Sequence, residues 1–71
     1  METTIKFLSF RDVCGLTALS RASIYRLMET GEFPRPVKLV GEKSMRIAFL
    51  KTEVEGWMNR QITDRDEASA A

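Results

Sequence analysis

The sequence holds few side chains of the types that carry out reactions. It has no histidine and a single cysteine, Cys14, which excludes an internal disulfide, a zinc site built from cysteine and histidine, and a nucleophile activated by histidine. The carboxylate pairs Glu53/Glu55 and Asp64/Asp66 are two residues apart, so they would not face each other on a helix. We therefore expect a binding protein rather than an enzyme, with no metal and no cofactor.

The side chains best suited to binding lie on a segment that is predicted to be a helix. Ser20 is a favoured N-cap, Gly31 a favoured C-cap, and Ile24, Leu27 and Met28 form an apolar stripe at helical spacing. The remaining face carries arginine, which can bind guanine or phosphate, serine, which can bind phosphate, and a small methyl group that fits beside thymine. An ordinary solvent-exposed face is the alternative. The candidate DNA-contacting residues here are Ser20, Arg21, Ala22, Ser23, Tyr25 and Arg26.

Two short extended segments follow this helix. Residues 37–40 and 45–49 are rich in apolar and β-branched side chains, and the polar residues 41–44 between them include a glycine. This pattern predicts a β-hairpin, which must pack on a helix because a two-stranded hairpin alone is marginally stable. Basic and polar residues on and before it are candidates for phosphate contacts: Arg35, Lys38, Lys43, Ser44 and Arg46.

Two further helices must hold these elements in place. A short helix is expected to start near Phe10, because Ser9 and Asp12 have the spacing of a capping box; Val13 and Leu16 are placed on its inner face. The turn to the next helix is assigned to residues 15–20. A last helix is predicted from Thr52 to about Ile62, with a capping box and one apolar face. The capping box is formed by Thr52 and Glu55. The apolar face carries Val54, Trp57, Met58 and Ile62.

Length and charge limit the organisation of the chain. Seventy-one residues allow one domain, expected over residues 5–62 between a flexible start at 1–4 and a flexible acidic tail at 63–71. The net charge is +1, but residues 1–63 hold ten bases and seven acids, which is compatible with a nucleic-acid partner. No apolar run is long enough to span a bilayer and no secretory signal starts the chain, so we expect a cytoplasmic protein without a membrane partner.

The order of helix, turn, helix, hairpin and helix defines a winged helix-turn-helix, a mainly α fold with a small β-hairpin. The segment LSRASIYRLMETGEFP, residues 19–34, resembles the signature of AlpA-like phage regulators, which are related to excisionases and share a MerR-type winged helix-turn-helix. The similarity continues through residues 36–39, 46–49 and 52–58. It implies a sequence-specific double-stranded DNA binder of a phage, prophage or other integrated element.

The same resemblance implies a biological role and identifies three departures from the family. Such proteins activate transcription of integration or excision genes, or act in DNA recombination as directionality factors beside a tyrosine integrase. Ser20, Arg21, Ser23, Tyr25 and Arg26 match the DNA-reading helix, whereas Ala22 stands where the family often has serine or threonine. Ala18 replaces the usual glycine of the turn, which would be strained if that position needs a positive φ. Gly56 stands where alanine is common in the family, which weakens the last helix modestly.

Partners other than DNA remain open at this stage. A tyrosine integrase, RNA polymerase and cooperative self-association on DNA are the candidates, with the protein associated with the bacterial nucleoid. The alternative function is an adaptor that binds an integrase or polymerase without reading DNA. Trp57 is interpreted as a core anchor rather than a binding residue, since tryptophan at core spacing on a helix is usually structural.

Overall fold

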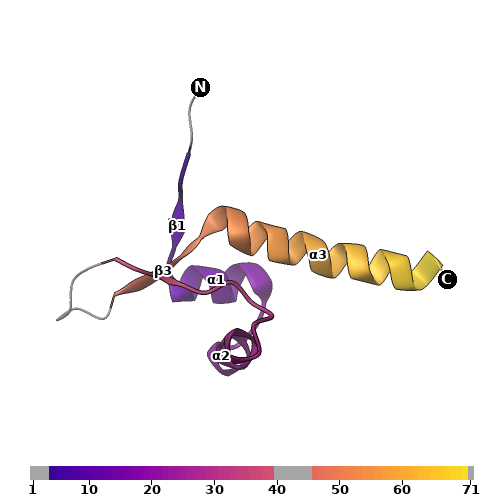
Figure 1. Ribbon diagram of the computed structural model, residues 1–71, viewed down its shortest axis with the longest axis horizontal. Helices are drawn as coiled ribbons and strands as arrows, with labels where there is room; N and C mark the ends of the chain where they lie inside the picture. The colour runs from indigo at the N-terminus through magenta and orange to yellow at the C-terminus, as the bar shows by residue number, and fades with distance from the viewer. Residues whose placement is uncertain (1–3, 40–45, 71) are drawn as a thin grey trace.

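The computed structural model describes residues 4–39 and 46–70. Its elements in chain order are β1 (Phe7–Leu8), α1 (Phe10–Thr17), α2 (Arg21–Glu29), β2 (Val37–Lys38), β3 (Ile47–Leu50) and α3 (Lys51–Ala70). The strands form a small antiparallel sheet in the order β1-β3-β2. In Figure 1, α1 and α2 lie together on one side of the strands, and α3 runs away from them to the far end of the molecule. The predicted mainly helical fold with a small hairpin is confirmed.

The predicted hairpin is present, and a third strand joins it. Val37 pairs with Ala48 and Lys38 with Ile47, and the Leu39 N–H donates to the Arg46 carbonyl at 3.1 Å. The connection predicted at residues 41–44, with Lys43 and Ser44, lies outside the described residues. On the other edge β1 pairs with β3, a strand that the sequence did not predict because two residues are too short to show a periodic pattern.

The start of α1 agrees with its predicted capping box. The Ser9 hydroxyl accepts the Asp12 N–H at 3.0 Å, and the Asp12 carboxylate accepts the Ser9 N–H at 3.1 Å. The prediction for Leu16 is wrong, because its side chain is 51% exposed. The buried face of α1 is the one that carries Phe10 and Val13, and Leu16 falls one turn after Asp12, on the solvent side.

The turn between α1 and α2 is shorter than predicted, covering residues 18–20 only. Ala18 ends α1 in the left-handed region, with φ 63° and ψ 22°, and its N–H donates to the Cys14 carbonyl at 2.9 Å. The Thr17 hydroxyl then accepts the Leu19 N–H at 3.3 Å. The positive φ that a glycine would accept without strain is therefore required at a position occupied by alanine.

Replacing Ala18 by glycine is expected to stabilise the domain. The left-handed conformation costs an L residue roughly 1 to 2 kcal/mol, part of which is offset by the greater freedom of glycine in the unfolded chain, so the net gain is about 0.5 to 1 kcal/mol. The urea midpoint, followed by circular dichroism, checks this. A lower midpoint for Ala18→Gly would mean that the turn does not hold this conformation in solution.

The core lies between the sheet and the three helices. Phe49 on β3 is fully buried, with its ring edge-on to those of Phe10 (5.5 Å between centroids) and Phe33 (5.8 Å). Phe33 enters the core because Gly31, at φ 80°, reverses the chain after α2, and the Glu32 N–H donates to the Leu27 carbonyl at 2.8 Å. The buried apolar cluster consists of Leu8, Phe10, Val13, Ile24, Phe33, Phe49 and Val54.

Helix α3 differs from its prediction at both ends. It begins at Lys51, directly after β3, where the Lys51 N–H donates to the Lys6 carbonyl at 2.9 Å, so Thr52 lies within the first turn rather than before it. The sequence predicted a helix end near Ile62 and a flexible tail, whereas residues 63–70 continue as helix. Ile62 is 49% exposed because α3 has by then left the core. None of the helices in the described part of the chain has both the length and the apolar composition to cross a membrane.

Candidate nucleic-acid interface

Helix α2 turns its apolar stripe inward and its polar residues outward. Ile24 is fully buried, and Leu27 and Met28 pack partly buried against the core cluster, as the spacing predicted. The predicted DNA-contacting residues lie on the other side: Ser20, Arg21, Ala22, Tyr25 and Arg26 are exposed and Ser23 is half-buried. The first turn of α2 contains no acidic residue, so nothing there repels a phosphate.

Three polar side chains form a hydrogen-bonded group at the start of α2. The Ser20 hydroxyl caps the helix by accepting the Ser23 N–H at 3.2 Å, and it donates to the Ser23 hydroxyl at 3.0 Å. The Arg26 guanidinium donates to the same Ser23 oxygen at 3.3 Å. This places the Arg26 cation beside the N-terminal turn, where the helix dipole already favours an anion.

Two further side chains of α2, those of Arg21 and Tyr25, pack on Phe10, the first residue of α1. The Arg21 guanidinium lies 4.6 Å from the centre of the Phe10 ring, and the Tyr25 ring is 5.1 Å from it. Phe10 is buried, so its position is fixed, and it orients both side chains while Tyr25 remains 49% exposed. The sequence analysis identified Phe10 only as the start of a short helix. No local pattern could have shown that Phe10 meets α2, since a turn separates the two.

Replacing Ser20 by aspartate separates its capping role from a phosphate contact. Aspartate caps a helix as well as serine, so the thermal midpoint of Ser20→Asp should stay within about 2 °C of the original. Its charge would repel a nearby phosphate, and duplex DNA affinity at low salt should fall roughly 5-fold or more. Ser20→Ala removes the hydroxyl without adding a charge, so it should lose about 1 kcal/mol of stability and weaken DNA binding less than Ser20→Asp does. Undiminished affinity for Ser20→Asp would exclude a phosphate next to this residue.

Of the predicted hairpin residues, the strand register places only Lys38 on the face of the sheet that packs against the core. Arg35, Lys38 and Arg46 are all exposed. Lys38 is paired with Ile47, whose side chain packs against the core cluster, so Lys38 projects on the face of the sheet that the helices cover. Arg46 is one residue before Ile47 and therefore projects on the opposite face. Lys43 and Ser44 lie outside the described residues.

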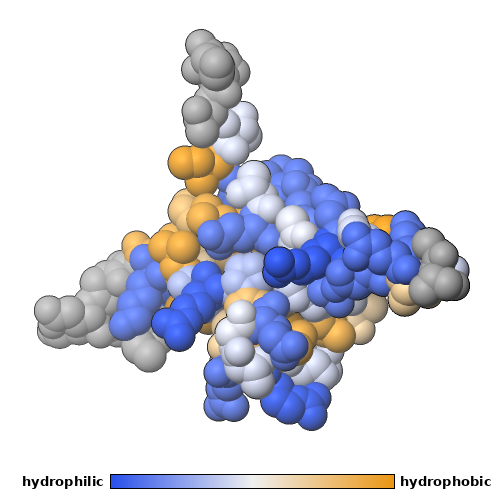
Figure 2. Space-filling view, turned by 45° about the vertical axis from the view of Figure 1, so that its right-hand side comes forward, coloured by the Kyte–Doolittle hydropathy of each residue, from blue (hydrophilic) through white to orange (hydrophobic). Residues whose placement is uncertain are grey.

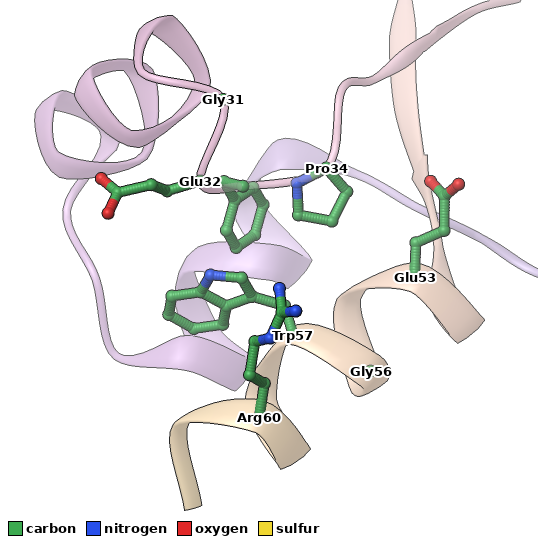
Figure 3. A pocket seen from close by; sticks show the side chains of 8 residues that line it. Gly31, Glu32, Pro34, Glu53, Gly56, Trp57 and Arg60 are labelled. Atoms are coloured by element: carbon green, nitrogen blue, oxygen red, sulfur yellow. The ribbon is translucent and has the colours of Figure 1, made fainter. Parts of the chain in front are cut away.

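The hollow around Trp57 is shallow and mixed in charge. It measures about 270 Å³, and Figure 3 shows Trp57 beneath the segment with Glu32 and Pro34, with Arg60 beside the indole. The Trp57 ring is edge-on to that of Phe33, with 5.0 Å between their centroids. This packing ties α3 to the segment after α2 and supports the interpretation of Trp57 as a structural anchor.

Hydrophobic surface gathers away from these polar residues. Figure 2 shows it where the N-terminal segment meets the sheet, while hydrophilic residues cover most of the rest of the visible face. The exposed apolar residues of these segments are Ile5 before β1, Phe7 on β1 and Leu39 after β2. None of these three residues lies on α2.

Comparison with known proteins gives two matches. Residues 6–62 match the family described as prophage CP4-57 regulatory protein (AlpA). The chain is also 41% identical over 63 residues to a protein of Enterobacteria phage P4 described as uncharacterized protein ORF88, an alignment that covers 89% of this chain and 68% of the phage protein. No solved structure matches. Since the family match spans the sheet, α1, α2 and the first part of α3, the chain belongs to the AlpA family of prophage regulatory proteins.

Proposed function

We propose that the protein binds double-stranded DNA with α2 in the major groove. The observation that carries this proposal is the outward face of α2, where Arg21 and Arg26 lie beside hydroxyl groups and a small side chain at a helix N-terminus free of acids. A face of this kind can place arginine at guanine edges and hydroxyls at phosphates. Arg21, whose guanidinium packs on the Phe10 ring, is suited to contact a phosphate of the DNA backbone. Arg26, whose guanidinium is hydrogen-bonded only to the Ser23 hydroxyl within the described part of the chain, is suited to contact a base.

The hairpin would act as a wing beside α2. Lys38, on the face of the sheet that the helices cover, would hold a phosphate and contribute to the salt dependence of binding. Arg35, Lys43, Ser44 and Arg46 remain proposed phosphate contacts from the sequence. A domain of this size buries about 600 to 1,000 Å² on DNA, so a single copy would bind with modest affinity.

We infer the regulatory role of this DNA binding from membership of the AlpA family. The protein would control transcription of integration or excision genes of a phage or prophage, or direct recombination beside a tyrosine integrase. RNA polymerase is the corresponding partner for activation. The protein would carry out no reaction itself, and its effect would depend on where it binds.

Selection from a random duplex library tests the proposal. The protein should enrich one sequence, retard it in a gel at micromolar protein and low salt, and protect it in footprinting of the promoter and attachment regions next to its gene. Absence of retardation for any duplex under these conditions would contradict DNA binding and favour the adaptor function.

A further inference from the structure

A groove of about 430 Å³ lies on the side of α1 that faces away from the core. Its apolar part consists of Leu8 and Leu16, and Leu16 is 51% exposed. Three cations surround this apolar part, against one carboxylate, Asp12, which already accepts the Ser9 N–H at 3.1 Å. The lining residues are Lys6, Leu8, Arg11, Asp12, Gly15, Leu16 and Lys51.

This basic groove is independent of the proposed DNA-binding face. Its lining residues come from α1, from the segment around β1 and from the first residue of α3, with none from α2. On α1 they lie opposite Phe10 and Val13, the residues that face the core. A ligand in the groove and DNA on α2 could therefore be bound at the same time.

The C-terminal part of α3 carries an exposed apolar side chain and acidic side chains, which complement the basic groove. Ile62 continues the stripe of Val54 and Met58 by steps of four residues, yet it is 49% exposed because the core ends before it. Asp66 follows Ile62 by one turn on the same side, and Glu67 lies beside it on the flank. Asp66 contacts Arg65 at 2.8 Å, but both side chains are mostly exposed, so this ion pair is weak.

This end of α3 cannot reach the groove of its own chain. Lys51 lines the groove and is also the first residue of α3, and Asp66 lies fifteen residues further along one continuous helix. At about 1.5 Å per residue the two are separated by roughly 22 Å. Only a second copy of the chain can bring the acidic segment to the basic groove.

We propose that α3 of one copy docks in the groove of the next, with Ile62 against Leu16 and the carboxylates of Asp66 and Glu67 near Lys6 and Arg11. The contact joins two different surfaces, so it does not close into a dimer and can extend to further copies. Such a contact would help copies of the protein to bind neighbouring sites along a DNA duplex. This advantage rests on the proposed function, whereas the contact between copies does not depend on DNA binding. A contact made by one apolar pair and a few charged side chains is weak in free solution, with a dissociation constant of about 0.1 to 1 mM.

Analytical ultracentrifugation without DNA tests the contact directly. The protein at about 1 mM and low salt should show concentration-dependent association that weakens as salt is added. The double variants Lys6→Glu/Arg11→Glu and Asp66→Lys/Glu67→Lys should each raise the dissociation constant about 10-fold. An equimolar mixture of the two should recover most of the association, because a reversed groove then meets a reversed helix.

Apolar variants provide the second arm and the matched control. Ile62→Ser and Leu16→Ser should each weaken association about 5-fold, whereas Leu39→Ser, which removes an equally exposed side chain outside both surfaces, should leave it unchanged. All seven sites substituted in the charged and apolar variants are exposed, and circular dichroism verifies folding. A monomer at all concentrations, association insensitive to these changes, or no recovery in the mixture would overturn the proposal. Retained binding to a single DNA site would show that the proposed function survives.

Discussion

Replacing Phe49 by alanine is expected to remove about 3 to 5 kcal/mol of folding free energy, which is most of what a domain of this size has. The Phe49 side chain is fully buried on β3, the central strand of the sheet. Its ring meets those of Phe10 and Phe33, which come from α1 and from the segment after α2. Alanine would leave a cavity at the point where these elements meet, and the variant should be largely unfolded at 37 °C.

Phe7→Ala is the matched control for this prediction. Phe7 lies on the neighbouring strand, one position from the residue that pairs with Phe49, but it is 46% exposed. Its loss should cost about 1 kcal/mol or less. Urea and thermal unfolding by circular dichroism compare the two variants. Equal losses for Phe7→Ala and Phe49→Ala would mean that the core is not centred on β3.

The parts of the fold that depend on local pattern could be predicted from the sequence. The capping box of Ser9 and Asp12, the N-cap Ser20 and the left-handed Gly31 act within one helical turn, and all three are present. The hairpin pairing of residues 37–39 with 46–48 follows from two short β-rich segments close in sequence. In each case the residues that determine the structure are neighbours in the chain.

The parts that depend on distant contacts could not be predicted. Strand β1 is two residues long and exists because Phe7 and Leu8 pair with Leu50 and Phe49, more than forty residues away. Leu16 and Ile62 have helical spacing to core residues, but whether such a residue is buried depends on where the neighbouring element ends. The extension of α3 to Ala70 escaped prediction because the segment has no large apolar residue, although its residue types permit a helix.

In the candidate site, too, the features set by local pattern could be predicted, and those set by distant contacts could not. Periodicity placed the polar residues of α2 on one exposed face, and the structure puts them there. It could not show that Phe10 supports Arg21 and Tyr25, or that Lys38 and Arg46 project on opposite faces of the sheet. These relations depend on how the helices and the sheet are oriented, which no short segment determines.

Replacing Arg26 by alanine is expected to weaken binding to the selected duplex about 5- to 150-fold, which corresponds to ~1 to 3 kcal/mol. Arg26 is exposed, and among the described residues the only hydrogen-bond partner of its guanidinium is the Ser23 hydroxyl at 3.3 Å. Folding stability should therefore change by less than about 0.5 kcal/mol, and the loss would belong to the DNA contact. Fluorescence anisotropy with the selected duplex and with single-base variants measures both affinity and specificity.

Two further variants identify what Arg26 contacts. Arg26→Lys keeps the charge but not the planar fork, so it restores affinity only if Arg26 binds a phosphate and fails to restore it if Arg26 reads a guanine. Lys38→Ala should weaken all duplexes alike and reduce the slope of log affinity against log salt by about 1. Unchanged affinity for Arg26→Ala would remove Arg26 from the interface. Full rescue by Arg26→Lys would assign sequence reading to other residues of α2.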